Sequence, residues 1–156
     1  MIVDDNADAA RLLGKLFRRA GYEVAEVGDH HLALSSLVEE SHPIAAVVSS
    51  FSTAGTGASL RLLDAVRNHY DARINKVRFL LISDHPRKRI FCFQAGADAI
   101  LLRPLDSNEL LTAAAEMVTR PDDERVTYRR QQIQSLKADP DGAAVPVSSM
   151  SPTVTF

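Results

Sequence analysis

The chain has 156 residues, of which 46% are hydrophobic and 24% are charged, and its formal net charge is −2. This length predicts one domain with enough apolar residues for a core, and the charge gives no support for direct binding of nucleic acid. The single cysteine excludes an internal disulfide bond, and no apolar run approaches the roughly 20 residues that span a bilayer. The N-terminus (MIVDDN) lacks the regions of a signal peptide. We therefore expect a cytoplasmic protein that does not enter a membrane.

Short apolar runs alternate with amphipathic stretches over the first 118 residues. Asn6 can cap the first helix, which Gly21 ends, and Ser107 can cap the last one. The predicted strands are Ile2–Val3, Tyr22–Val27, Ile44–Val48, Val77–Ser83 and Ala99–Leu102, and the predicted helices lie between Asn6 and Gly21, at His31–Glu40, around Leu60–Val66, at Ile90–Ala95 and at Asn108–Val118. Strict alternation of strand and helix predicts an α/β fold, a doubly wound five-stranded parallel sheet with helices on both faces.

The composition changes after Thr119. Pro121–Arg130 is highly charged, and residues 142–156 (GAAVPVSSMSPTVTF) are mostly small or polar, as in disordered segments. Tyr128–Ala138 could form a helix, but it has too few apolar positions to be stable alone. We expect one domain over residues 1–118 and a partly disordered linker or tail over 119–156. The sequence leaves open whether an effector domain is missing and whether the N-terminus is complete.

Two adjacent carboxylates, Asp4 and Asp5, follow the first predicted strand. In open α/β sheets the carboxyl ends of the strands are where ligands usually bind. Carboxylate oxygens are the ligands that Mg²⁺ prefers, so the pair could hold this ion weakly. The alternative is that one of the two carboxylates only caps the helix that follows.

The chain resembles the receiver domains of two-component response regulators over about residues 1–118. The resemblance rests on Asp4-Asp5, on Ser83 at the end of FLLIS, and on the stretch GADAILLRPL (Gly96–Leu105). It implies the CheY-like, flavodoxin-like fold of five βα units. It also implies that the third strand should end in an aspartate that accepts a phosphoryl group from a histidine kinase.

A serine stands at that acceptor position. Counting from Pro43 or back from Gly57 selects Ser49, whereas counting from Gly55 selects Ser50, and residues 44–63 contain no Asp or Glu. A carboxylate is anionic at neutral pH, but a serine hydroxyl needs a base before it can attack phosphorus. The resemblance is therefore to a degenerate pseudo-receiver that lacks the phosphoacceptor.

Other departures from the family pattern agree with this interpretation. Arg103 replaces the lysine that precedes a cis-proline (here Pro104), Ile100 replaces the switch aromatic residue, and the segment from Ser83 to Gly96 is short. Because Arg can clamp a carboxylate with two parallel hydrogen bonds, we expect Arg103 to form a salt bridge with Asp4 or Asp5 and lock the site.

The resemblance implies a signalling module and not an enzyme, since no set of base, nucleophile and oxyanion donors is visible. It would act without Asp phosphorylation and need no cofactor. Its partner, another protein or a second copy, would bind the face made by the fourth helix, the fifth strand and the fifth helix. The alternative is a sensor of an anionic ligand such as a cyclic dinucleotide, held by the basic cluster at the start of the fourth helix: Arg87, Lys88 and Arg89.

Overall fold

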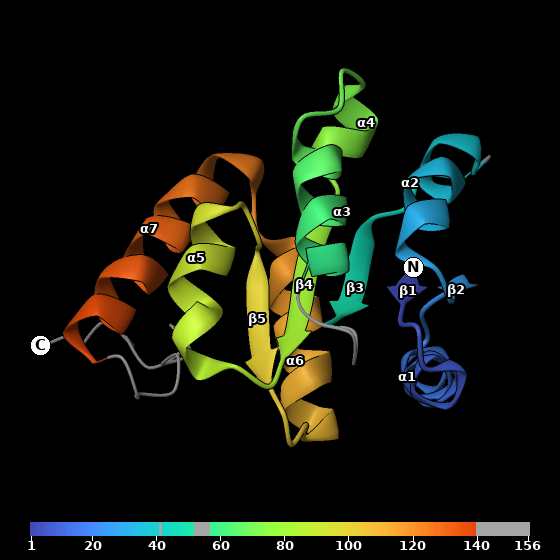
Figure 1. Cartoon of the computed structure of the whole chain (residues 1–156), viewed down its shortest axis with the longest axis horizontal. Helices are drawn as coiled ribbons and strands as arrows, with labels where there is room; N and C mark the ends of the chain where they lie inside the picture. Colours follow the sequence, from blue (N-terminus) through green and yellow to red (C-terminus); the bar gives the residue numbers. More distant parts are fainter. Residues whose placement is uncertain (41, 52–56, 140–156) are drawn as a thin grey trace, which may run out of the picture.

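A computed structural model describes residues 1–40, 42–51 and 57–139 of the chain (Figure 1). The strands are β1 (Ile2–Val3), β2 (Glu26–Val27), β3 (Ala46–Ser50), β4 (Arg78–Ser83) and β5 (Ala99–Leu102). The helices are α1 (Ala7–Arg19), α2 (His30–Glu39), α3 (Gly57–Arg67), α4 (Ala72–Asn75), α5 (Arg89–Gln94), α6 (Ser107–Thr119) and α7 (Asp122–Ala138), and a 3-10 turn, η1 (Pro86–Lys88), precedes α5.

The five strands form one parallel sheet in the order β2-β1-β3-β4-β5, which confirms the predicted doubly wound α/β fold. Its strand order reverses direction at β1, so the carboxyl ends of β1 and β3 flank the point where open α/β sheets usually bind ligands. In register, Val3 of β1 lies opposite Ser49 of β3. Asp4 therefore follows β1 at the same edge of the sheet.

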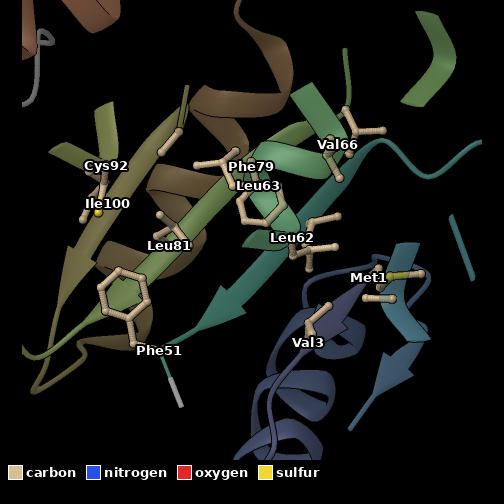
Figure 2. Packing of buried hydrophobic residues seen from close by; sticks show 14 of the residues in the cluster. Met1, Val3, Phe51, Leu62, Leu63, Val66, Phe79, Leu81, Cys92 and Ile100 are labelled. Atoms are coloured by element: carbon tan, nitrogen blue, oxygen red, sulfur yellow. The ribbon is translucent and has the colours of Figure 1, made fainter. Parts of the chain in front are cut away.

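Side chains on successive strand residues point to opposite faces and build two apolar clusters. Val47 belongs to the cluster under α2, α3 and α5, and Val48 belongs to the cluster under α1 and α6. Figure 2 shows the first cluster, where Phe79 and Leu81 of β4 meet residues of α3. Both faces of the sheet are thus covered, as a parallel sheet requires.

Helix ends follow local capping chemistry. Asn6 caps α1 as predicted, and its side chain accepts hydrogen bonds from the amides of Asp8 and Ala9. Gly21, at a φ of 93°, follows the end of this helix in a conformation that suits glycine. The prediction for α6 was one residue off: Asp106, not Ser107, is the cap, since its carboxylate accepts two amide hydrogen bonds at the helix start.

Helix α7 lies beside α5, outside the β5 edge of the sheet (Figure 1). The expectation of a linker from residue 119 is wrong for residues 122–138, because this segment is a packed helix. Leu136 is 3% exposed and belongs to the same apolar cluster as the inner residues of α5. The tail predicted to be disordered, residues 142–156, lies outside the described residues.

Candidate functional site at the carboxyl ends of the strands

Asp4 and Asp5 differ in their surroundings. Asp4 is 3% exposed, and its Oδ1 accepts a hydrogen bond from the Asn6 amide at 2.9 Å. Its Oδ2 is buried and has no hydrogen-bond partner among the described residues. Asp5 is exposed. The described residues hold no group of three or more His, Cys, Asp or Glu side chains that could bind a metal ion. The unpartnered oxygen suits a cation, but two carboxylates fit only a weakly held and largely hydrated Mg²⁺.

Ser49, one of the two candidates for the acceptor position, belongs to a buried hydrogen-bond network. The Oγ of Ser49 lies 3.1 Å from Nε2 of His30 and 3.1 Å from Oγ of Ser59. The same Nε2 lies 3.0 Å from the Ser59 Oγ, and that hydroxyl donates to the Ser50 carbonyl at 2.7 Å. Ser49 and Ser59 are fully buried, and His30 is 7% exposed.

The protons in this network decide what Ser49 can do. Ser59 has one hydroxyl proton, and the short bond to the Ser50 carbonyl uses it. Ser49 donates its own proton to Ser59. Nε2 of His30 lies within hydrogen-bond distance of both hydroxyls, and the ring tautomer sets whether it donates or accepts. The Ser49 hydroxyl is fully buried in this network, so it is not exposed to a phosphoryl donor in solution.

The other serine at the end of β3 has no such network. Ser50 is 1% exposed, and its Oγ has no partner among the described residues. The choice between Ser49 and Ser50 as the counterpart of the acceptor stays a prediction, but both candidates are buried hydroxyls.

Arg103 does not reach the acidic pair, so the predicted locking salt bridge is wrong for this structure. Its Nη1 instead lies 3.3 Å from Oδ2 of Asp84, and both side chains are partly exposed. The reason is the strand order: Asp84 follows β4, which neighbours β5, whereas β1 lies three strand spacings of about 4.8 Å from β5. An exposed pair of this kind contributes little to stability.

Three other predicted residues lie at or near the same edge. The Ser83 hydroxyl is buried and accepts a hydrogen bond from the His85 amide at 2.9 Å. Ile100 is 7% exposed and packs in the cluster under α5, so an aliphatic core residue stands where the resemblance expects a switch aromatic residue. The peptide bond between Arg103 and Pro104 is cis.

The three residues of the basic cluster differ in how exposed they are. Arg87 and Lys88 are exposed in the η1 turn. Arg89, however, is 3% exposed, and its Nε donates to the Pro86 carbonyl at 3.1 Å. Arg89 is therefore not exposed to a ligand in solution, although the prediction requires this. Binding of a cyclic dinucleotide stays a prediction, and of the three cations only Arg87 and Lys88 are exposed for it.

Sequence reasoning missed His30 and Ser59 as members of the site. His30 and its neighbour His31 do not form a metal-binding pair, because neighbouring residues on a helix point apart, and here one side chain is buried and the other exposed. The available signal was Asp29, which caps α2 and fixes where the helix starts. A cavity of about 450 Å³ lies elsewhere, beside Met1, Val24 and Ile44 at the amino ends of the strands.

No helix among the described residues is long and apolar enough to cross a membrane. No protein-family model and no curated protein matches the chain.

Solved structures do match it. One is a candidate response regulator from Chloroflexus aurantiacus, with 26% identity, coverage of 76% of this chain and 95% of that one, and a TM-score of 0.65. Another is the chemotaxis response regulator CheY4 of Vibrio cholerae, with 22% identity, coverage of 74% and 94%, and a TM-score of 0.62. A third is the receiver domain of NtrX from Brucella abortus, with 19% identity, coverage of 77% and 98%, and a TM-score of 0.63.

Proposed function

Because the chain has the fold of a response-regulator receiver domain, we propose that it works as a signalling module that needs no phosphorylated aspartate. One observation carries this proposal: Ser49, which we take as the counterpart of the acceptor in preference to Ser50, has its hydroxyl buried in the network with His30 and Ser59. A phosphoryl acceptor must be accessible, and this hydroxyl is fully buried.

The charges around the site support the same function. A phosphorylated carboxylate would need a nearby cation, but Arg103 is paired with Asp84, which follows β4. Burying a dianionic phosphate beside the unpartnered Oδ2 of Asp4 would bring like charges together without that cation. The edge that resembles a phosphorylation site is therefore better suited to staying in one state than to being switched by phosphate.

A module that is not switched by phosphate would act through contacts with a protein. The face that the family resemblance implies consists here of α5, β5 and α6, and α7 already covers part of α5. We propose that regulation or scaffolding of a partner takes place at this face.

The first test is the intact mass of the chain after incubation with Mg²⁺ and acetyl phosphate, beside a receiver domain that has its acceptor aspartate. A thermal-shift titration with Mg²⁺ and beryllofluoride is run on both. We expect the control to gain one phosphoryl group and a stabilising shift, and this chain to gain neither. A stable gain of one phosphoryl group would show that another residue accepts phosphate and would overturn the proposal.

The variant Ser49→Asp provides the matched comparison. It places a third carboxylate beside Asp4 and Asp5, and a set of three oxygen-bearing side chains should hold Mg²⁺ more tightly than two. We expect a thermal shift with millimolar Mg²⁺ for the variant that is larger than that of the unaltered chain. Equal shifts would mean that Ser49 does not lie where the acceptor of a receiver domain stands.

A further inference from the structure

Helix α7 docks on the rest of the chain mainly through polar side chains. Three of its residues are buried, namely Arg125, Gln132 and Leu136, and only one of these is apolar. Tyr128 adds an edge-to-face contact with Phe93 of α5, with ring centroids 6.5 Å apart. A helix held in this way differs from α3, whose buried residues are mostly aliphatic. The sequence and contacts of α7 resemble those of a helix bound to a surface more than those of a core element.

Asp98, just before β5, is the anchor for α7. Arg125 approaches it with two nitrogens: Nε lies 2.9 Å from Oδ1 and Nη2 lies 2.7 Å from Oδ2. Arg129, one helical turn further on, places Nη1 at 3.0 Å from Oδ1. Nη1 of Arg125 also donates to the Lys76 carbonyl at 2.9 Å. Two arginines one turn apart therefore bind the same buried carboxylate, and one of them also binds a neighbouring carbonyl.

The body of the domain pairs one oxygen of Asp98, Oδ2, without α7. Arg67 of α3 donates to Oδ2 at 2.8 Å, and the Phe79 amide donates to the same oxygen at 3.0 Å. Arg67 is itself fixed by hydrogen bonds to the carbonyls of Asn75, Val77 and Gly96. If α7 left, Asp98 would keep one countercharge. The undocked state thus avoids an unpaired buried carboxylate, which would otherwise be costly.

The docked state has features that limit its stability. Three guanidinium groups share one carboxylate. Burial, together with repulsion from Arg125 and Arg129, lowers the pKa of Arg67 to about 10. The buried Oε1 of Gln132 has no partner among the described residues. These costs, together with the small apolar contact, favour a helix that can leave its site without unfolding the sheet.

We infer that α7 is a releasable cover over an interaction surface, which consists of Phe93, Asp98 and the Lys76 carbonyl. When α7 leaves this surface, a partner helix with two arginines one turn apart binds there. The partner's chemistry follows from charge complementarity: the carboxylate is anionic, and Arg125 and Arg129 of α7, one turn apart, both reach it. This inference deepens the proposed function, on which it rests for the role of the α5 face. It makes no use of Ser49.

The test uses the full chain and a labelled synthetic peptide of residues 122–138 as the probe. Arg125→Ala with Arg129→Ala should release α7 and expose the surface. The control removes two exposed cations of the same helix, Arg130→Ala with Lys137→Ala. By fluorescence anisotropy we expect the peptide to bind the first variant at least tenfold more tightly than the unaltered chain or the control. A peptide that lacks both of its own arginines should not bind.

Hydrogen exchange on the same proteins separates release of α7 from general unfolding. In the variant that lacks Arg125 and Arg129, we expect amides of α7 to exchange at least tenfold faster while those of β3 and β4 keep their protection. Equal loss of protection in α7 and in the sheet would show that α7 is part of the cooperative core and would overturn the inference. Equal binding of the peptide to the variant, the unaltered chain and the control would also overturn the inference. Neither result would alter the outcome of the acetyl phosphate experiment, so the proposed lack of phosphorylation would stand or fall separately.

Discussion

The substitution Asp98→Asn tests how strongly one buried carboxylate holds the domain together. Asp98 is 1% exposed and accepts hydrogen bonds from the Phe79 amide and from three arginines, Arg67, Arg125 and Arg129. Asparagine keeps the size of the side chain but removes its charge. The three guanidinium groups would then face a neutral amide, part of which presents a donor and not an acceptor.

The size of the effect follows from which arginines can move. Removing one partner of a buried ion pair costs about 3–5 kcal/mol. The lower end of this range applies, because Arg125 and Arg129 can follow α7 into water, whereas Arg67 is fixed to three backbone carbonyls. We expect a loss of about 3 kcal/mol in the free energy of unfolding. With an m-value of about 1–3 kcal/mol per molar urea, the midpoint should fall by about 1–3 M.

Urea titration followed by far-ultraviolet circular dichroism measures this loss. Asp84→Asn is the matched control, since Asp84 is 59% exposed and makes one contact, with Arg103 at 3.3 Å. Its cost should lie within about 1 kcal/mol. If the two variants lose the same amount, the buried cluster at Asp98 makes no net contribution, and its assignment as the anchor of α7 is wrong.

Three further predictions concern the acceptor edge and α5. His30→Ala leaves two buried serine hydroxyls without their ring partner and should cost about 1–3 kcal/mol in urea titration, whereas His31→Ala, at an exposed position, should change stability by less than about 0.5 kcal/mol. Arg103→Ala should cost no more than about 1 kcal/mol by the same method, and a loss of several kcal/mol would instead support a salt bridge with the acidic pair. Burial raises the pKa of the Cys92 thiol from 9.0 to about 11, so iodoacetamide should modify the native protein far more slowly than the urea-unfolded chain. Since the folded pKa is the higher one, this thiol's contribution to stability is complete below pH 9 and declines as the pH rises toward 11, and rapid native labelling would contradict its burial.

The sheet could be predicted from the sequence because its signals are local. Ile44–Val48 is apolar throughout, and a parallel strand buried on both faces needs this pattern. The structure shifts this strand to Ala46–Ser50, so both serines belong to it. The strand predicted at Tyr22–Val27 pairs only at Glu26–Val27. The local sequence pattern thus predicts which segments are strands, whereas the residues at which each strand begins and ends depend on pairing with the neighbouring strand.

Contacts between distant residues explain most of what the sequence did not reveal. The sequence of α7 is polar, so its own pattern does not predict a helix that is stable alone. The residue that holds this helix, Asp98, lies 27 positions before Arg125, so the contact is not visible in the local sequence. Asp98 was visible in the stretch GADAILLRPL, but nothing in that stretch shows that arginines from two helices converge on it. Arg103 shows the same limit, since the choice between Asp4 and Asp84 as its partner depends on the strand order.

At the carboxyl ends of the strands, Arg103 after β5 is paired with the exposed Asp84, and β3 ends in the hydroxyls of Ser49 and Ser50. The strongest described cluster of buried charge lies instead before β5, at Asp98. In the proposed function a signal must reach the face made by α5, β5 and α6. A helix that docks at Asp98 contacts α5 directly, so its release can change this face without any change at the acceptor edge. The proposed regulation by α7 and the proposed lack of phosphorylation are therefore compatible in one domain, because Asp98 precedes β5 at its amino end, whereas Ser49 lies near the carboxyl end of β3.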